Sequence, residues 1–541
     1  MTDPVRDQRQ SVETTMAGEQ PRADQESPVP AYSWYALGVL FLVYLVNFID
    51  RQILSILAND IKADLGLDDA DLGFLYGTAF AIFYALFGIP LGHLADRWSR
   101  TRLLGLGLLL WSAMTALSGF ARNGATLALA RVGVGVGEAT ASPCAYSLIA
   151  DWFPQRMRGT ALGIYSAGLF LGSGLSLLIG GAVVQGWNAA FPVNPPMELA
   201  GWQVAFLAAG APGLLLALLV FSLREPVRGG TDGIPVDAAA LPVSPWAIFA
   251  VQLQRIVPPF TVFGAARRGP MALLANLAGA GAMALLAWGL GRITGNPGQF
   301  WFVALGCYAV WSWAVSLRHD EPAAFALTCA NRPFMAITLA YAGVCFVGYT
   351  VTYWAAPYAE RVFMLGKAQL GWLLGAPAAA GGFIGVLTGG RLADYLQQRR
   401  ADGRLLVVLA GVLGPVPLVL IGYGSSSLTV FLICSLLLQI VTSSALSAAA
   451  AASQALVPPQ MRGTATAIFF LGTTLIGLAF GPFTAGYVSE VTGNLALGVI
   501  GNLAIVPLAL AALIIGMRSY ATAVARVASR ATVAGDTLTS G

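Results

Sequence analysis

Long apolar segments, separated by short polar loops, fill most of this chain. A helix needs about 20 apolar residues to cross the hydrocarbon core of a bilayer. The pattern predicts six such spans in the first part of the sequence, at 34–58, 71–95, 102–121, 125–150, 159–185 and 201–223. Six more are predicted towards the carboxyl end, at 333–357, 370–391, 404–423, 428–452, 463–488 and 495–517. The chain is therefore expected to be an all-α integral membrane protein.

The segment between these two groups contains further apolar stretches. Two more spans are predicted at 271–291 and 299–317, which brings the expected total to 14. The stretch 245–264 is interrupted by Arg255 and by a Pro-Pro pair. We expect it to form an amphipathic helix at the membrane interface, with three apolar side chains facing lipid, namely Trp246, Phe249 and Ile256.

The two ends of the chain are polar. Residues 1–30 contain no apolar segment typical of a signal peptide, and the residues after Arg518 are similar in composition. We predict disordered cytoplasmic tails at 1–30 and 519–541. The expected organisation between them is an N-terminal six-helix bundle at 31–224, a central linker at 225–331 and a C-terminal six-helix bundle at 332–518.

Three short motifs occur twice, in the same order. Leu-Gly-Phe-Leu at 72–75 returns as Leu-Gly-Trp-Leu at 370–373, and Gly-His-Leu-Ala-Asp at 92–96 returns as Gly-Arg-Leu-Ala-Asp at 390–394, both at an offset of 298. Met-Arg-Gly-Thr-Ala at 157–161 returns unchanged at 461–465. Since each pair falls on one side of the membrane, this is a parallel repeat, and it resembles the two halves of major facilitator transporters.

The basic residues predict the orientation. One set of loops is rich in arginine, at positions 97, 100, 102, 156, 158, 224, 228, 267, 268, 391, 399, 400, 404 and 462. The opposite set holds only Lys62, Arg122, Arg292, Arg361 and Lys367. Cytoplasmic loops carry the excess of Lys and Arg. We therefore expect both termini to be cytoplasmic, in a multi-pass protein of the cell inner (plasma) membrane.

Composition argues against several function classes. Of 541 residues, 57% are hydrophobic and 10% are charged, whereas soluble domains carry about 25% charged residues. The basic residues form no stripe, so we expect no nucleic-acid partner. Neither the two histidines nor the five cysteines show metal-ligand spacing, and no nucleophile–base pair is visible. We expect no enzyme activity, no cofactor and no metal site.

Four ionisable residues lie inside predicted spans. Asp50 and Arg51 belong to the first span, and Arg131 and Glu138 to the fourth. A charge at mid-membrane costs about 2.5–3.5 kcal/mol on insertion scales, so such groups face a partner or a water-filled cavity. Arg131 and Glu138 share one helix face, about 10 Å apart along the axis, a gap that long side chains or a first-span residue can bridge. Glycines within 133–137 let another helix approach.

The second half lacks these charges. At the repeat offset, the first-span pair corresponds to Gly348 and Tyr349, and the fourth-span pair to the uncharged region 429–442, where Gln439 is the main polar candidate. The alternative is a purely structural salt bridge. Such a bridge would not require the charged residues to be confined to the first half. The asymmetry therefore favours a role in handling protons or substrate.

The loop after the second span carries a further motif. Gly92 and Asp96 precede a basic run that includes Arg97 and Arg100, and this resembles the loop signature of major facilitators. Asp96 can accept hydrogen bonds at a helix start, and Arg100 can pair with Asp96 and Asp151. We expect a cytoplasmic gate, although the arginines alone also mark the inner face. Its expected members are Gly92, Asp96, Arg97, Arg100, Asp151, Arg158, Asp394 and Arg462.

Several of these motifs together resemble the spinster family. They are Asn-Phe-Ile-Asp-Arg at 47–51, the loop at 92–102, the segment 131–138, Ser-Leu-Ile-Ala-Asp at 147–151 and Gly-Ser-Gly-Leu at 172–175. The resemblance is dense over 47–181 and thinner over 333–517. It implies a major facilitator fold and transport of sphingolipids or lysolipids, with proton coupling in bacterial members. The spans at 271–317 depart from the twelve-helix pattern of that family.

The residues and the resemblance lead to one expected function. It is secondary active transport of a lipid-like amphiphile by alternating access, with protons as the second partner and a monomer in the lipid bilayer. Proton coupling is assigned to Asp50, Glu138, Arg51 and Arg131. Substrate binding is assigned to Arg51, Arg131, Asn47, Tyr349, Tyr353, Trp354 and Gln439, with Phe346 completing an apolar wall. The alternatives are a proton-driven efflux pump for cationic amphiphiles and a non-transporting membrane sensor.

Overall fold

The computed structural model describes residues 29–232, 244–458 and 461–539, and these residues form helices without strands. The N-terminal half comprises α2 (Ala31–Leu65), α3, η1 and α4 (Asp69–Gly73, Phe74–Thr78, Ala79–Ala95), α5 (Arg100–Ser118), α6 (Gly124–Glu138), α7 (Ala141–Trp152), α8 (Gln155–Ala190), η2 (Pro196–Glu198), α9 (Gly201–Phe221) and η3 (Gly230–Asp232). The linker holds α10 (Pro245–Ile256), α11 (Phe260–Arg267), α12 (Pro270–Thr294), α13 (Pro297–Asp320) and α14 (Pro322–Leu327).

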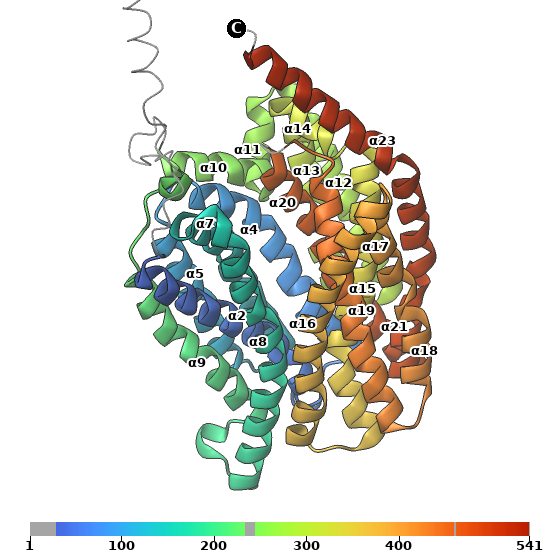
Figure 1. Ribbon diagram of the computed structural model, residues 1–541. Coiled ribbons are helices and arrows are strands. Elements are labelled where there is room, and N and C mark those ends of the chain that lie inside the picture. Colours follow the sequence, from blue (N-terminus) through green and yellow to red (C-terminus); the bar gives the residue numbers. More distant parts are fainter. Residues whose placement is uncertain (1–28, 233–243, 459–460, 540–541) are drawn as a thin grey trace, which may run out of the picture.

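The C-terminal half repeats this order. It comprises α15 (Arg332–Phe363), α16 (Lys367–Arg399), α17 and α18 (Gly403–Leu413, Pro415–Gly424), α19 (Leu428–Gln454), α20, η6 and α21 (Arg462–Thr473, Thr474–Leu478, Ala479–Thr492), and α22, η7 and α23 (Leu495–Gly501, Asn502–Ile505, Val506–Thr539). The two halves lie side by side in Figure 1, with the N-terminal half in blue to green and the C-terminal half in yellow to red.

Thirteen helices among the described residues are long and apolar enough to cross a membrane. The predicted span at 125–150 is absent from that set because it is divided into α6 and α7. Counting this divided span gives the fourteen that the sequence predicts. The α10–α11 pair bends by 94°, which suits a segment lying along the interface rather than crossing the bilayer. The protein is thus a multi-pass membrane protein with a major facilitator architecture.

Two hydrogen bonds mark the axis that relates the halves. The Ser55 hydroxyl on α2 donates to the carbonyl oxygen of Tyr353 on α15 at 2.6 Å. The Asn59 amide donates to the carbonyl oxygen of Pro357 at 3.3 Å. Both pairs are separated by 298 residues, the offset of the sequence repeat. Equivalent residues meet only near a two-fold axis, so α2 and α15 cross on it.

The halves are joined at one end only. We call the end that carries residues 60–71 the outer end, following the orientation that the arginines predict, and the opposite end the inner end. Ion pairs between the halves lie at the outer end, for example Arg361 with Asp69 and Lys367 with Asp60. No ion pair among the described residues joins the halves at the inner end. The ribbons also converge towards the lower, outer end of Figure 1. In the predicted orientation, the structure is therefore inward-facing.

Two expectations about the periphery are wrong. The segment after Arg518 was predicted to be disordered, but its described residues continue α23 as far as Thr539. Alanine is the strongest helix former, and it recurs through this segment. Ile256 was predicted to face lipid, yet it is fully buried, because α10 packs against α4. Residues 1–28 of the predicted amino-terminal tail lie outside the described residues.

Candidate functional site

A buried ion pair joins the first and fourth spans. The Nε and Nη2 atoms of Arg51 both donate to Oε2 of Glu138, at 3.1 and 2.5 Å. The side chain of Glu138 is fully buried and that of Arg51 is 10% exposed. Three aromatic rings surround the guanidinium, since its carbon lies 4.5–5.1 Å from the ring centres of Phe48, Phe80 and Tyr84. Such rings stabilise a cation that has been withdrawn from water.

The other two charges are incompletely paired. Arg131 reaches the carbonyl oxygen of Asp50 at 3.4 Å, and its Nε and Nη2 atoms have no hydrogen-bond partner among the described residues. Both carboxylate oxygens of Asp50 and Oε1 of Glu138 are equally without one. The hydroxyl of Thr115 lies beside Asp50, outside hydrogen-bonding geometry. An unsatisfied buried polar group is costly, so these atoms suit a site whose partners change during function.

The pairing differs from the arrangement suggested by sequence order. In the sequence, Asp50 is the neighbour of Arg51, and Glu138 shares a helix face with Arg131. Successive residues of a helix point in different directions, so Arg51 projects to Glu138 while Asp50 faces the side of Arg131. The first-span bridge to the fourth span is therefore made by Arg51.

Glycines bring the helices of this site together. A Cβ atom at Gly135 would lie 2.6 Å from the carbonyl oxygen of Phe80, and one at Gly137 would lie 2.8 Å from that of Gly107. Only glycine permits α6 to approach α4 and α5 this closely. With α6 held in this way, Arg131 and Glu138 lie in the interior of the N-terminal bundle and contact α2.

The remaining predicted substrate residues fall into two groups. Asn47 is buried beside Glu138, and Tyr349 and Gln439 are half-buried on α15 and α19. By contrast, Tyr353 stacks on Tyr76 with ring centres 4.2 Å apart.

Trp354 lies deeper in the contact between helices. Its indole nitrogen donates to the carbonyl oxygen of Pro482 at 2.9 Å, and the whole residue is fully buried. Tyr353 is buried to the same degree. Tyr353 and Trp354 therefore hold helices together in this state and do not form an open wall, because the outer end closes over them.

At the inner end, Arg100 organises a cluster within the N-terminal half. It forms an ion pair with Asp151, donates to Glu225 at 2.7 Å and donates to the Ser147 hydroxyl at 2.7 Å. Burial acts to raise the pKa of Glu225, but hydrogen bonds from Arg100 and from the Thr101 amide outweigh it and hold that pKa below its usual value. The cluster ties the loop after α4 to α7 and to the end of α9.

The other predicted gate residues do not meet across the halves. Asp96 is exposed and forms no ion pair with Arg100, contrary to expectation, because Arg100 is turned towards Asp151. Arg158 donates to the carbonyl oxygens of Ala150 and Phe153. The rest are also placed within single halves: Gly92 faces Pro143, Arg97 is half-buried, Asp394 pairs with Arg404, and Arg462 is exposed at the start of α20.

Sequence reasoning missed a second charged cluster, which closes the outer end. Asp69 at the start of α3 accepts two hydrogen bonds from Arg361, at 2.7 and 2.8 Å. It accepts two more, from Lys62 at 2.7 Å and from Ser489 at 2.6 Å. Lys367 lies between Asp60 and Glu360, at 2.7 and 2.9 Å. These residues sit at helix ends, where sequence analysis used their charges only to determine orientation.

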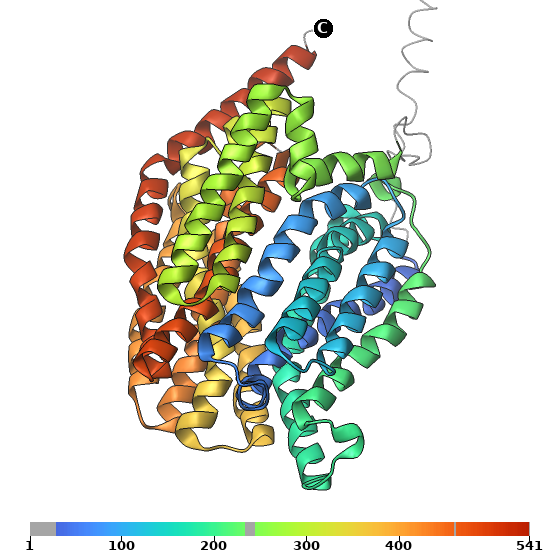
Figure 2. The ribbon, with the colours of Figure 1, turned by 180° about the vertical axis from the view of Figure 1, so that it is seen from behind.

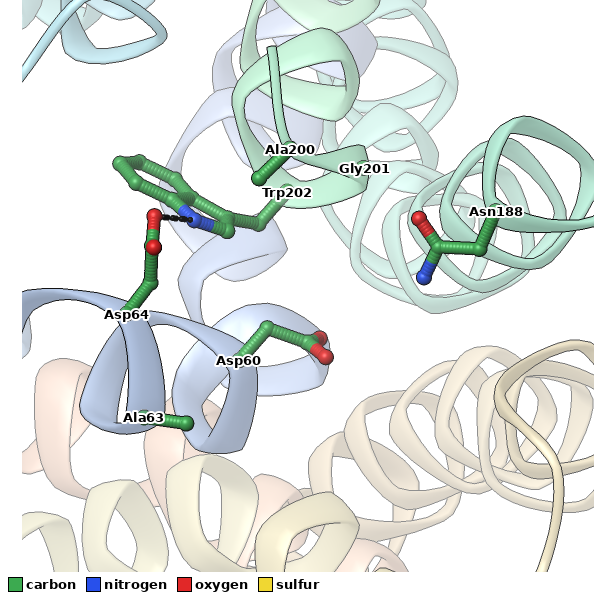
Figure 3. Close-up of a pocket in the computed structure, with 7 residues that line it drawn as sticks. All are labelled: Asp60, Ala63, Asp64, Asn188, Ala200, Gly201 and Trp202. Atoms are coloured by element: carbon green, nitrogen blue, oxygen red, sulfur yellow. Dashed lines mark hydrogen bonds between the residues drawn. The ribbon is translucent and has the colours of Figure 1, made fainter. Parts of the chain in front are cut away.

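A shallow hollow at the outer end is separate from the buried charges. It measures about 350 Å³ and is lined by Asp60, Ala63, Asp64, Asn188, Ala200, Gly201 and Trp202. Figure 3 shows the indole nitrogen of Trp202 directed at Asp64, to which it donates at 2.8 Å. Since the hollow belongs to α2, α8 and α9 alone, it does not lie between the halves.

Comparison with known proteins agrees with this architecture. The family model of the Major Facilitator Superfamily matches residues 40–354, and the chain belongs to this superfamily of membrane transporters. Within it, the chain is similar to spinster proteins. It resembles the protein spinster of Drosophila melanogaster, with 29% identity over 210 residues that cover 38% of this chain and 32% of the fly protein.

Two other similarities extend over nearly the whole chain. An MFS-type efflux pump of Mycolicibacterium smegmatis is 28% identical over 501 residues, which cover 92% of this chain and 94% of the pump. The crystal structure of a bacterial homolog of the human lysosomal transporter Spinster, inward-facing and unoccupied, is 26% identical. It superposes with a TM-score of 0.65 and covers 93% of this chain and 99% of its own.

Proposed function

We propose that this spinster-like chain is a proton-coupled transporter of an amphiphile with an anionic or zwitterionic head group and a single long chain. The observation that carries the proposal is the set of two acids and two arginines buried within the N-terminal half, of which only Arg51 and Glu138 form an ion pair. We further propose a monomer in the plasma membrane with both termini in the cytoplasm.

Proton coupling follows from the competition for Arg51. When Glu138 is ionised, its Oε2 atom occupies both donors of Arg51. Protonation of Glu138 removes the charge that holds the pair together, so the guanidinium becomes free for another anion. Asp50, with no partner for its carboxylate oxygens among the described residues, supplies a second place for the proton.

The same arginines suit an anionic head group. A guanidinium matches the oxygens of a phosphate or carboxylate in a bidentate manner, and Arg131 retains two nitrogen atoms without partners. On the facing half, the half-buried Tyr349 offers an apolar ring, with Phe346 buried on the same helix, and burial of an alkyl chain contributes about 0.8 kcal/mol per methylene. A head group at the arginines and a chain along α15 describe a lysolipid or sphingoid type of substrate.

A second candidate is proton-driven efflux of cationic amphiphiles. The relative that aligns over 92% of this chain is called an efflux pump, and a cation would bind the acids rather than the arginines. If this function is correct, Arg51 and Arg131 only neutralise Asp50 and Glu138. The protein then prefers a cationic head group to an anionic one.

Binding measurements distinguish the two candidates. Affinity for a lysophospholipid and for a cationic amphiphile of the same chain length is measured in detergent for wild type, Arg51→Ala and Arg131→Ala. Arg292→Ala serves as the control because Arg292 is exposed on the linker. We expect both site variants to weaken the lysophospholipid selectively. If the cation binds as tightly and neither variant weakens the anionic ligand, the efflux function is the correct one.

A further inference from the structure

One helix of the linker touches both halves. On α13, the ring of Phe302 lies 5.1 Å from that of Phe74 on η1 and 5.7 Å from that of Phe83 on α4. The ring of Phe300 lies 6.0 Å from that of Phe483 on α21. The helix α13 therefore lies across the seam where the second span meets the eleventh.

The middle of α13 fits closely into this seam. A Cβ atom at Gly306 would lie 2.6 Å from Ile82 on α4 and 3.4 Å from Leu475 on η6. Beneath it, the Thr78 hydroxyl donates to the carbonyl oxygen of Ala479 at 2.5 Å. In Figure 2 the α12–α13 hairpin, in yellow-green, lies against the C-terminal half beside the blue α4.

The linker is attached mainly to the N-terminal half. Trp246 on α10 packs on Trp98 at 5.2 Å, and α10, α13 and α4 contact one another. Within the linker, the Tyr308 hydroxyl donates to Asn276 at 2.6 Å and shares a hydrogen bond with Thr261 at 2.8 Å. These buried bonds make α11, α12 and α13 one unit, whereas the contacts of this unit with Phe483 and Leu475 of the C-terminal half are apolar.

The opposite seam has no such cover among the described residues. There α8 and α16 meet through glycines, and a Cβ atom at Gly375 would lie 2.5 Å from the carbonyl oxygen of Gly174. Towards the inner end, a Cβ atom at Gly163 would meet no atom within 4 Å, so no helix packs on α8 at this position. Large side chains along this seam remain exposed, for example Leu171 at 44% and Phe383 at 47%.

We propose that the α12–α13 hairpin moves with the N-terminal half and seals the seam between the second and eleventh spans. No substrate chain then passes through this seam, and the two lateral routes out of the central space become unequal. The blocked route for a substrate chain rests on the proposed amphiphilic substrate. The movement of the hairpin with the N-terminal half can be tested without any substrate.

The first test uses cysteine pairs in a cysteine-free background. Phe302→Cys with Phe83→Cys joins α13 to the N-terminal half, and Phe300→Cys with Phe483→Cys joins it to the C-terminal half. A short, reducible thiol crosslinker is applied, and opening of the outer end is followed by fluorescence transfer between dyes attached by a thiol-independent chemistry at Val193 and Val491.

We expect the first crosslink, between α13 and the N-terminal half, to leave outer opening unchanged. We expect the second, between α13 and the C-terminal half, to abolish outer opening until the thiol crosslinker is reduced. A block by the first crosslink, free opening with the second, or failure of either pair to react would overturn the proposal. This readout does not depend on which substrate is carried.

The second test uses a lysophospholipid with a diazirine in its chain. After illumination, we expect labelled peptides from α15 and from α8 or α16, while labelling of Ile82 on α4 or of Leu475 on η6, which lie under α13 in the seam, would overturn the sealed seam. Absence of labelling anywhere would contradict the amphiphilic substrate instead, and the crosslinking result would still decide how the hairpin moves.

Discussion

The outer charged cluster gives the clearest quantitative prediction. Asp69 is 3% exposed and accepts four hydrogen bonds, two of them from Arg361 and one each from Lys62 and Ser489. Arg361 and Ser489 belong to the opposite half. The substitution Asp69→Asn keeps the shape of the side chain but removes its charge, so the inward-facing state should lose stability relative to the outward-open one.

The size of this effect lies between two limits. Breaking a fully buried ion pair costs about 3–5 kcal/mol, whereas exposed pairs contribute about 0.2–1 kcal/mol. The side chains of Lys62 and Arg361 are 35% and 30% exposed, so solvent weakens their attraction to Asp69. We expect a shift of about 2 kcal/mol, which corresponds to roughly 30-fold in the ratio of the two states.

Spin-label distances across the outer end measure this ratio. Labels at Val193 and Val491 suit the purpose because these residues are 76% and 69% exposed at the outer ends of the two halves. Asp64→Asn is the matched control, since the one side-chain bond of Asp64 among the described residues is to Trp202 of its own half. We expect a longer-distance population in Asp69→Asn and none in the control. Identical distance distributions in Asp69→Asn and wild type would show that this cluster does not hold the outer end closed.

Other predictions concern the inner end and the linker. Arg100→Ala removes the cation that pairs with Asp151 and Glu225, whose side chains are 10% and 31% exposed. It should cost about 3 kcal/mol of stability, the lower end of the range for buried ion pairs, seen as a lower melting temperature in detergent. The pKa of Glu225 is lowered, so ionised Glu225 should stabilise the fold above pH about 4.3. This stabilisation should be lost as the pH falls through the lowered pKa. A melting temperature equally sensitive to acid in Glu225→Gln and in wild type would refute this. Asp96→Asn should favour inward-open states by about 1–3 kcal/mol, and unchanged distances across the inner end would contradict a gating role. Deletion of 270–318 should preserve substrate binding if the protein folds, and loss of binding by a folded deletion would show that the hairpin is part of the site.

The spans and the repeat were predictable because they depend on local hydrophobicity and on motif order. The division of the fourth span was not read from hydropathy, although Glu138 and Pro143 on either side of the break mark it in the sequence. Hydropathy records how apolar a segment is, and it does not record where backbone hydrogen bonds change partners.

The buried charges were also visible in the sequence, but their partners were not. Asp50 and Arg51 are adjacent in the chain, yet Arg131 donates to the carbonyl oxygen of Asp50 while Arg51 pairs with Glu138. The outer cluster was missed for a related reason, because Asp69 and Arg361 lie 292 residues apart. Such pairs depend on how the two halves meet, which periodicity within one span does not encode.

The central claim, that Asp50 and Glu138 couple protons to transport, is tested most directly by pH-gradient-driven uptake of a lysophospholipid into proteoliposomes. Wild type, Asp50→Asn and Glu138→Gln are compared with and without a proton gradient, after equal reconstitution. We predict that the gradient accelerates uptake in wild type and that at least one of the two variants loses this acceleration while still exchanging substrate at equal pH. Full dependence on the gradient in both variants would contradict the assignment.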